Sequence, residues 1–377
     1  DIWGRDFYFM WQFDSRGRMY SKGYECNIQG NEFSRALLDF AKGEKLTSSG
    51  LDALLCASAG TDGGDKLTWG KRINLGALLI EDRVTKTSNE WDIDASGIKK
   101  PLMFIKYAEA YCNLMDDPNS LCHTPIEMDA TASGLQMLAA LTGCRDTAKA
   151  VNLVDTGKRE DVYTHISNGM NSMLDSHLHV TKEDTKQPFM THWYGSSAVP
   201  KEAFNEEQLV AFHSALEGEF TGPERFMKLV EKYWKDRDTF TFTMPDGHKA
   251  VVKMHVLQTA TVKLAEDAEF DYDYETHTAT GSILHIWANM THMVDAWVAR
   301  QMVLRCDFHV ATIHDAYFCL PNHAHKMGET YREIMAELAE SNLLESMLTE
   351  LAGHPVKFEK GCNDLAKDIR KSVYAIC

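Results

Sequence analysis

Two short apolar segments, each with an aspartate at its end or tip, constrain the possible folds of this chain most strongly. Ile126–Asp129 has the pattern of a strand, and the small and apolar residues of Ser133–Leu141 predict a helix directly after it. In Phe308–Leu320 apolar residues flank the polar pair His314-Asp315 on both sides, which predicts a tight hairpin with a carboxylate at its tip. We therefore expect a small sheet with carboxylates at its strand ends.

Carboxylates at strand ends suit a particular chemistry. Two of them can share two magnesium ions roughly 3.5–4 Å apart, the arrangement used for in-line phosphoryl displacement. One ion makes the attacking hydroxyl a better nucleophile and the other neutralises the triphosphate, so Asp129 and Asp315 are candidate catalytic residues. Taken singly, each is better explained as a turn residue or a strand terminator, because aspartate is common in turns.

The segment Val180–Ser196 carries lysines and a tyrosine at helical spacing. Lys182, Lys186 and Tyr194 lie four and eight residues apart, so one continuous helix would place them on one face. At about 1.5 Å per residue, Tyr194 would lie roughly 12 Å beyond Lys186, which suits a nucleoside triphosphate along the helix. Gly195 would let a template strand approach the backbone closely. An amphipathic surface helix with solvated lysines explains the same spacing without a ligand.

The rest of the chain predicts a mixed fold with many helices. Its 377 residues, 44% of them hydrophobic, are enough for a large core and two or three packed units. No apolar run approaches the roughly 18 residues of a membrane helix, so we expect no membrane span. The other expected elements are a strand–loop–strand over Phe7–Tyr20, helices over Asn31–Lys42, Pro101–Met115, Leu284–Leu304 and Ala324–Leu348, mostly helix over 150–240, and strands over Phe240–Val262.

The net charge of −16 argues against nucleic acid as a ligand, because proteins that bind a phosphate backbone usually have a basic excess. Composition alone would favour an ordinary acidic enzyme. Basic residues gathered in one cleft, or a partner that supplies positive surface, would reconcile the charge with a nucleic-acid substrate. The local motifs therefore carry the argument.

Together these segments resemble the single-subunit DNA-dependent RNA polymerases of phages and mitochondria. The resemblance covers nearly the whole chain, and four motifs in the family's order argue against a chance match. They are the D-x-x-G-R loop at Asp14, Gly17 and Arg18, the first palm motif at Asp129, Ser133, Gly134 and Gln136, the fingers motif at Lys182, Lys186, Tyr194 and Gly195, and the His-Asp pair His314-Asp315.

The resemblance implies a role for each site residue. Asp129 and Asp315 are expected to hold two Mg²⁺ ions together with the backbone of Ala130, and Lys186 and Tyr194 to complete the catalytic set. The residues expected to bind the nucleotide are Lys66, Lys182, Lys186, Tyr194 and His292. Those expected to contact template or hybrid are Arg16, Arg18, Gly195 and Ser196, with His314 and Tyr163 beside the site.

The resemblance also implies an architecture. The fold class is α+β, a right-hand polymerase with a small antiparallel palm sheet and largely helical fingers. Residues 1–125 are expected to form the N-terminal part of the palm with the template loop, and 126–150 the palm with the first carboxylate. Residues 151–300 are expected to form the fingers with a reduced hairpin. Residues 301–377 return to the palm, where the segment Lys360–Cys377 folds back toward the active site.

The implied activity is DNA-templated RNA synthesis from nucleoside triphosphates. The family's large N-terminal domain and most of its thumb have no counterpart in the sequence, so a second chain is expected to supply them. The two-chain polymerases of the N-four phage type have such a layout. The partners would then be a DNA template, the RNA product, nucleoside triphosphates and the second chain, and the location would be the cytoplasm of an infected bacterial host.

The sequence departs from the family in three places. Lys182 replaces the usual arginine, so a bidentate phosphate clamp becomes a point charge. Pro188 lies inside the expected helix, which predicts a later start near Thr185 or a kink. Residues 265–275 contain six acidic residues and no basic one, a poor match for a DNA groove. We therefore expect this hairpin not to read promoter bases, and a recruiting factor to be needed.

Two other functions remain open. A DNA polymerase of the related right-hand class usually carries a glutamate shortly after the first metal-binding aspartate, as a gate against the ribose 2′-hydroxyl. Residues 130–134 contain no glutamate, and Tyr194 and His292 would accept the hydroxyl. A non-catalytic subunit derived from a polymerase would have no physical need for Asp129, Asp315, Lys186 and Tyr194 together.

Overall fold

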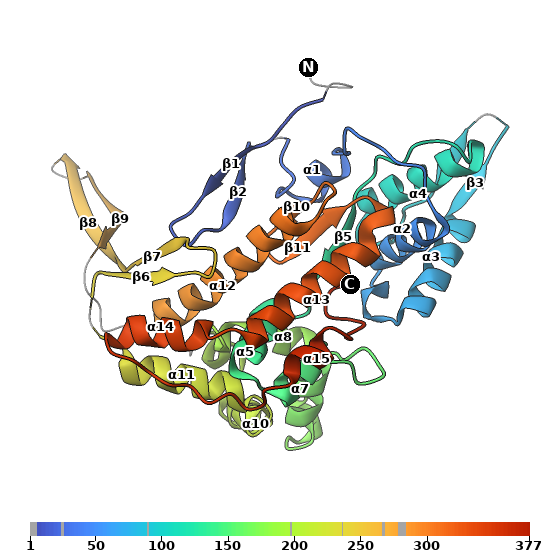
Figure 1. Ribbon diagram of the computed structural model, residues 1–377. Helices are drawn as coiled ribbons and strands as arrows, with labels where there is room; N and C mark the ends of the chain where they lie inside the picture. The colour runs from blue at the N-terminus through green and yellow to red at the C-terminus, as the bar shows by residue number, and fades with distance from the viewer. Residues whose placement is uncertain are drawn as a thin grey trace.

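The computed structural model describes residues 6–23, 26–88, 90–196, 198–235, 237–265, 268–277 and 284–377. A small antiparallel sheet lies among many helices, and four separate two-stranded hairpins accompany it in the described residues (Figure 1). The expected mixture of helices and small antiparallel sheets is confirmed. The right-hand arrangement and the four-part division of the chain stay predictions.

The central sheet joins the two aspartate segments. Its strands are β5 (Ile126–Asp129), β10 (Ala311–Ile313) and β11 (Ala316–Cys319), in the order β10–β11–β5. The two-residue turn of the β10–β11 hairpin requires a positive φ, which His314 supplies at +54°. Every residue of β11 is buried, so packing holds this strand in place. Asp315 directly precedes β11, and Asp129 ends the neighbouring strand β5, so both aspartates lie at the same end of a rigid part of the sheet.

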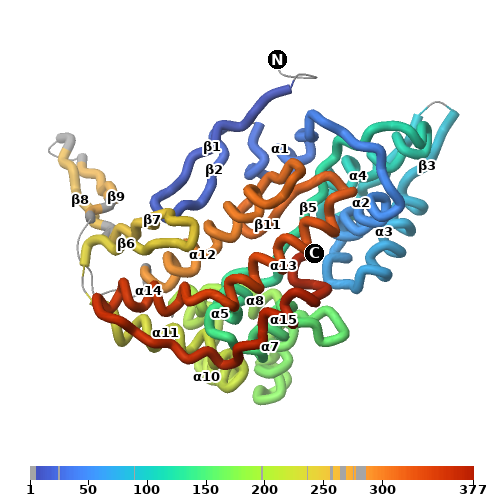
Figure 2. Tube along the Cα trace, viewed as in Figure 1, coloured from blue at the N-terminus to red at the C-terminus, as the bar shows by residue number. Residues whose placement is uncertain are grey.

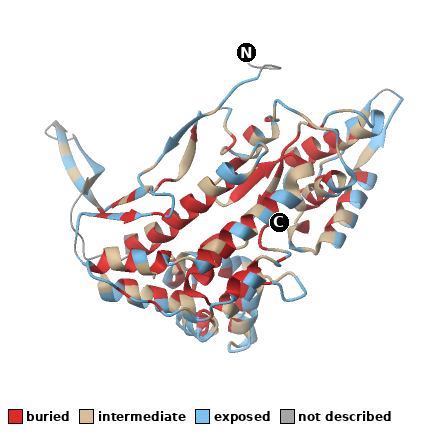
Figure 3. Cartoon of the chain, in the orientation of Figure 1, coloured by how far each residue is buried: buried red, intermediate tan, exposed pale blue. Residues whose placement is uncertain are grey.

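The helix α5 (Ser133–Thr142) follows β5 and is buried at every position. Its small and apolar residues allow burial all round, and it packs against α11, α12 and α13. The long helix α12 (Leu284–Arg305) and the helix α13 (Ala324–Glu340) lie side by side along the body (Figures 1 and 2). Their inward faces form much of the buried core that Figure 3 shows in red. The helices expected over Ser133–Leu141 and Leu284–Leu304 are confirmed, whereas the helix expected over Ala324–Leu348 is divided in two, because the backbone becomes extended at Ser341 and α14 (Leu343–Ala352) begins after it.

The segment 150–240 is mostly helical, as expected, and forms the lower part of the molecule in Figure 1. Its helices are α7 (Val162–Asn171), α8 (Lys182–His192), α9 (Ala198–Ala203), α10 (Glu206–Leu216) and α11 (Thr221–Tyr233). The remaining helices are α2 (Ser48–Gly60), α3 (Trp69–Arg83), α4 (Pro101–Asp116), α6 (Arg145–Ala150), α14 (Leu343–Ala352) and α15 (Leu365–Ile369). No helix in the described parts of the chain is long and apolar enough to cross a membrane.

The helix expected over Asn31–Lys42 is too long, because α1 spans only Glu32–Ala36. Asn31 caps it as expected. The helix ends early because the following backbone bonds to distant residues instead. The Phe40 N–H donates to the His123 carbonyl at 2.9 Å, close to where the chain approaches β5.

The start of α8 also differs from expectation. It begins at Lys182, not near Thr185, because a capping box satisfies the first N–H groups. The Thr181 hydroxyl accepts from the Asp184 N–H, and the Asp184 carboxylate accepts from the Thr181 N–H. Pro188 lies buried within the helix, where it removes one backbone hydrogen bond.

The hairpins lie around the edge of the molecule. They pair β1 (Met10–Phe13) with β2 (Met19–Lys22), β3 (Val84–Lys86) with β4 (Trp91–Ile93), β6 (Thr239–Thr243) with β7 (Lys249–Lys253), and β8 (His255–Ala265) with β9 (Ala268–His277). The expected strands over Phe7–Tyr20 and Phe240–Val262 are thereby confirmed. The β8–β9 hairpin extends from the body at the left of Figure 1 and carries the acidic segment, of which Glu266 and Asp267 lie outside the described residues.

Candidate active site

The sheet register brings the two predicted metal ligands together. Asp129 in β5 lies opposite Ala316 in β11, so Asp315 is one residue from the pairing position. The Asp129 side chain is in contact with water, but its pKa is raised to about 7. The larger cause is the loss of solvation among the surrounding protein groups, and the second is the negative charge of Asp315. The Ala130 N–H and Lys100 oppose this shift. The negative charges of the two carboxylates repel each other, and the neighbouring groups offset this repulsion only in part. A hard divalent cation, which prefers oxygen ligands, would offset the rest.

Backbone and buried polar groups support this pair from behind. The Asp129 N–H donates to the Cys377 carbonyl at 3.2 Å, and the Cys377 N–H donates back at 3.1 Å, so the C-terminal segment lies beside β5 as expected. The Gln136 amide donates to the carbonyls of Val151 and Ala375, both at 2.9 Å, and accepts from the Tyr331 hydroxyl at 2.7 Å. Gln136 of the first palm motif is therefore a buried structural link.

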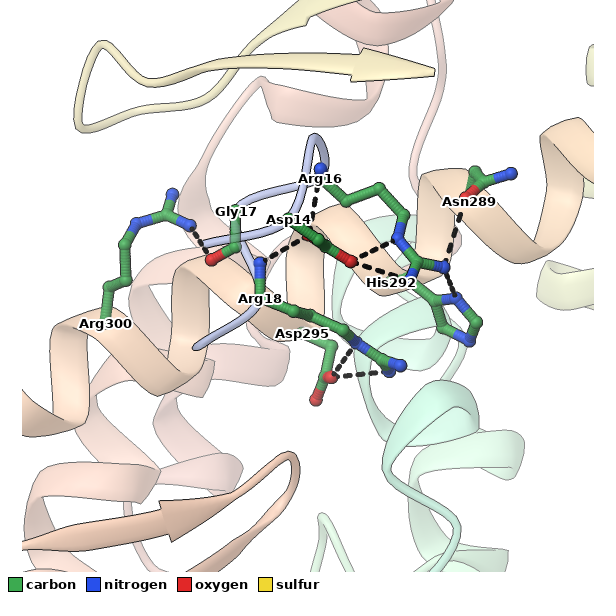
Figure 4. Close-up of polar contacts among 8 residues, drawn as sticks. All are labelled: Asp14, Arg16, Gly17, Arg18, Asn289, His292, Asp295 and Arg300. Atoms are coloured by element: carbon green, nitrogen blue, oxygen red, sulfur yellow. Dashed lines mark hydrogen bonds and ion pairs between the residues drawn. The ribbon is translucent and has the colours of Figure 1, made fainter. Parts of the chain in front are cut away.

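The D-x-x-G-R loop folds onto α12, as Figure 4 shows. The Asp14 carboxylate accepts from the backbone N–H groups of Arg16 and Arg18, each at 2.9 Å. Gly17 has φ of +88°, and its carbonyl accepts from Arg300 at 3.0 Å. This backbone conformation favours glycine, and a Cβ at Gly17 would also displace the Arg300 guanidinium, since it would lie 2.5 Å from Nη1.

Arg18, expected to contact the template, forms a buried ion pair. Its Nε and Nη2 donate to Asp295 Oδ2 at 3.0 and 2.7 Å (Figure 4). Asp295 is 3% exposed, and burial raises its pKa to about 6 although Arg18 opposes the shift. The pair joins the loop to the middle of α12. Its direct contact with nucleic acid stays a prediction.

This ion pair leads to a prediction about stability. Arg18→Met removes one partner of a buried pair and leaves the Asp295 carboxylate uncompensated. We expect the free energy of unfolding to fall by about 3–5 kcal/mol. The measurement is urea unfolding at pH 7.5. Arg305→Met is the matched control, because Arg305 forms a similar bidentate pair with Glu337 in a more exposed position and should cost at most about 1 kcal/mol. Equal losses in the two variants would contradict the assignment.

His292 is placed against both the template loop and the fingers. Arg16 Nη1 donates to His292 Nδ1 at 2.9 Å (Figure 4). Burial, then the charges of Arg18 and Arg16, lower the pKa of His292 to about 3, so the ring is neutral. Because Nδ1 accepts a hydrogen bond, we assign the ring proton to Nε2. The Tyr194 ring lies 5.3 Å from the His292 ring, which places the two predicted ribose neighbours together.

The expectation that Tyr194 shares a helix face with Lys186 is wrong. Helix α8 ends at His192, and Tyr194 lies in the following turn, where its N–H donates to the Thr191 carbonyl at 3.1 Å. Gly195 adopts φ of +86° there, which ends the helix. The Tyr194 hydroxyl instead approaches α5, since a Cβ at Gly134 would lie 2.9 Å from it. The glycine of the first palm motif therefore makes room for Tyr194.

The remaining predicted residues each have contacts of their own in the structure. The Lys186 amine lies 5.8 Å from the centre of the Tyr163 ring. Burial and then the charge of Asp129 raise the pKa of Tyr163, so Tyr163 lies within the field of the carboxylate pair. Lys182 forms an ion pair with Asp161, and Lys66 forms one with Asp65 at 2.6 Å. The structure also places Ser196 before α9, where its hydroxyl accepts from the Val199 N–H, and His314 against the Tyr20 ring.

Comparison with known proteins decides the family of this chain. The model of the DNA-dependent RNA polymerase family matches residues 44–237, about half of the chain. The chain belongs to this family. The matched region includes Asp129 and the fingers motif, and the structure places Asp315 beside them.

The curated relatives of this polymerase-family chain are much longer proteins. A probable DNA-directed RNA polymerase of Neurospora crassa is 33% identical over 211 residues, which cover 51% of this chain and 23% of the relative. A mitochondrial DNA-directed RNA polymerase of Neurospora crassa is 32% identical over 210 residues, 51% of this chain and 15% of the relative. The chloroplastic DNA-directed RNA polymerase 3 of Nicotiana sylvestris is 26% identical over 405 aligned positions, 91% of this chain and 40% of the relative. The chain thus spans less than half the length of these relatives.

The expected location in the cytoplasm of an infected bacterial host is wrong. The relatives whose names give a location are mitochondrial or chloroplastic polymerases. The motifs read from the sequence are expected in phage-type and organellar members of the family alike, so they carry no information about the compartment.

Three residues of the site were not predicted from the sequence. Asp295 had one usable signal, since it is a lone acidic residue in an otherwise apolar stretch of helix and such residues are rarely buried without a partner. Lys100 acts on Asp129 from the start of α4 through its charge. Arg159 donates to the Thr131 hydroxyl at 3.3 Å. Nothing in the local pattern distinguishes Lys100 or Arg159 from solvated surface residues.

Proposed function

We propose that this chain forms the catalytic centre of a DNA-directed RNA polymerase that extends RNA by nucleotidyl transfer from nucleoside triphosphates. The observation that carries the proposal is the juxtaposition of Asp129 and Asp315 across β5 and β11, in a chain of this family. The names of the relatives give the activity, and the paired carboxylates give it a chemical basis.

The donor set suits two Mg²⁺ ions. Asp129, Asp315 and the backbone carbonyl of Ala130 would hold them, and the ions, when bound, supply charge neutralisation and a more acidic attacking hydroxyl. The residues of the chain perform the other tasks. Lys186 neutralises charge on the departing pyrophosphate, and Tyr194 and His292 orient the ribose. Burial and the charges of Arg18 and Arg16 keep His292 in its neutral form, and Arg16 also donates to its Nδ1.

Primer extension tests this function. The purified protein is offered a primed single-stranded DNA template with Mg²⁺ and either ribonucleotides or deoxyribonucleotides. We expect template-directed addition of ribonucleotides, with strong preference over deoxyribonucleotides. A preference for deoxyribonucleotides would favour a DNA polymerase, and absence of any incorporation by the protein isolated with its native partners would support a non-catalytic role.

Sugar selection gives a sharper prediction. Tyr194→Phe keeps the ring beside His292 but removes a hydroxyl that is unsatisfied when a deoxynucleotide is bound. An unsatisfied buried polar group costs about 1–3 kcal/mol, so the ratio of kcat/KM for a ribonucleotide and its deoxy analogue should fall by roughly tenfold to a hundredfold. Activity on ribonucleotides should persist, and His292→Ala should weaken the same preference. Tyr374→Phe, whose ring stacks on Trp69, is the control and should leave the ratio unchanged. An unchanged ratio in an active Tyr194→Phe enzyme would remove Tyr194 from sugar selection.

We further propose that a second polymerase chain and a recruiting factor complete the enzyme. The net charge of −16 supports a partner that contributes positive surface toward nucleic acid. In β9, Glu269, Asp271 and Asp273 project into solvent, and the two aspartates accept from threonines across the hairpin. Such a surface repels a DNA groove, so promoter recognition falls to another protein.

A further inference from the structure

Arg159 lies at the edge of the carboxylate site without belonging to any motif. It is part of the loop between α6 and α7, and its Nη2 donates to the Thr131 hydroxyl at 3.3 Å. Thr131 is two residues after Asp129 in the same strand-to-helix connection. The guanidinium is thereby attached to the segment that presents the first carboxylate.

The loop that carries Arg159 is fixed at both ends. Asn152, with φ of +62°, donates to the Glu160 carbonyl at 2.9 Å and accepts from the Glu160 N–H at 2.7 Å. The Ser372 hydroxyl in turn donates to the Asn152 carbonyl at 2.8 Å. Because its neighbour Glu160 is held in this way, Arg159 is oriented before any ligand arrives, which lowers the entropy lost on binding.

Most of the hydrogen-bonding capacity of Arg159 is unused. Its Nε and Nη1 are buried and have no partner among the described residues. Asp65, an acidic group on which the charge of Arg159 acts, is already paired with Lys66 at 2.6 Å. Burial raises the pKa of Asp65, but Lys66 and, more weakly, Arg159 and Arg72 lower it below its usual value. Arg159 and Lys66 thus both act on Asp65 through their charges, and Arg159 also contacts the segment that follows Asp129.

We propose that Arg159 binds the phosphates of the incoming nucleoside triphosphate, together with Lys66 and Lys186. A shift of the side chain that exposes its unpartnered Nε and Nη1 would let the planar guanidinium bind phosphate oxygens in a bidentate way, which a lysine cannot do. Lys182, the other cation on this side of the fingers, is engaged by Asp161 and offers less charge to a ligand. This inference rests on the proposed polymerase function and adds a substrate-binding residue to it.

Equilibrium nucleotide binding tests the proposal without relying on turnover. The full chain on a primed template is titrated with ATP and with AMP, opposite the same template base. Arg159→Met should weaken ATP binding by roughly tenfold to a hundredfold and leave AMP binding unchanged. Arg159→Lys keeps the charge and the aliphatic stem but loses the paired donors of the guanidinium, so its loss of ATP affinity should be smaller. This variant replaces Arg159→Met in the test if Arg159→Met does not fold.

Lys158→Met is the matched control, because Lys158 precedes Arg159 and pairs with Glu160 at 3.2 Å on the surface. It removes the same charge and should change neither affinity. Equal losses for ATP and AMP in Arg159→Met would assign Arg159 to positioning of Thr131, and unchanged ATP affinity would exclude contact with the phosphates. If the unaltered chain binds ATP no better than AMP, the proposed function itself fails, and that result is distinct from either outcome for Arg159.

Discussion

Asp129→Asn and Asp315→Asn will each lower the rate of RNA synthesis by at least ~10³-fold, comparable to or larger than the loss of one preorganised electrostatic contact. Asparagine keeps the shape of the side chain but removes the negative charge that would hold the metal ions. Because both carboxylates serve the same ions, the double variant should be little worse than either single one. The measurement is single-turnover extension of a primed template over a range of Mg²⁺ concentrations.

Three controls separate this loss from damage to the fold. The pKa of Asp129 is about 7 in the folded chain, whereas an aspartate free of such surroundings has a pKa of 3.8. Asp129 therefore binds its proton more tightly in the folded state than in the unfolded state. Its ionisation therefore destabilises the fold as the pH rises from about 4 to 7, and Asp129→Asn should keep or increase the stability at neutral pH. Template binding should also survive. Asp307→Asn, in an exposed pair with Lys326, should have little effect on rate. Near-normal extension by either active-site variant would show that the metal assignment is wrong.

Local patterns predicted the central part of this fold well. The structure contains β5, the β10–β11 hairpin and α5 at the positions predicted from the sequence. The signals were apolar residues on both sides of a polar pair for the hairpin, a short apolar run for β5, and small and apolar residues for α5. Each of these signals lies within a few residues of the element that it predicts. The antiparallel register then brings Asp129 and Asp315 together, a step that follows from two correctly placed strand ends.

The errors arose where distant residues decide the outcome. The end of α1 depends on a backbone bond from Phe40 to His123, and the position of Tyr194 depends on space beside Gly134. The partners Arg18 and Asp295 are separated by 277 residues, so no sequence window contains both.

The geometry around Lys186 differs from that of the other fingers lysine. Lys186 lies on the exposed side of α8 with its amine over the Tyr163 ring, and it forms no ion pair within the described residues. Lys182, one turn earlier, is neutralised by Asp161. Tyr163 is buried and its pKa is raised in part by the charge of Asp129, so the Lys186 amine lies over a ring that is itself near the carboxylate site and offers no competing charge.

Lys186→Ala should therefore lower kcat/KM for ribonucleotides by roughly 10²- to 10³-fold, because the lost charge faces the developing pyrophosphate and contributes most in the transition state. The loss should appear mainly in kcat if the lysine acts on the leaving group, and mainly in KM if it binds the ground-state triphosphate equally well. Template affinity, measured separately, should not change. Lys182→Arg is the matched control on the same helix and should be tolerated, since it keeps the pair with Asp161 and restores a fork of donors. A Lys186→Ala enzyme with unchanged kcat and KM would place the triphosphate elsewhere and leave Lys66 and Arg159 as its remaining cations.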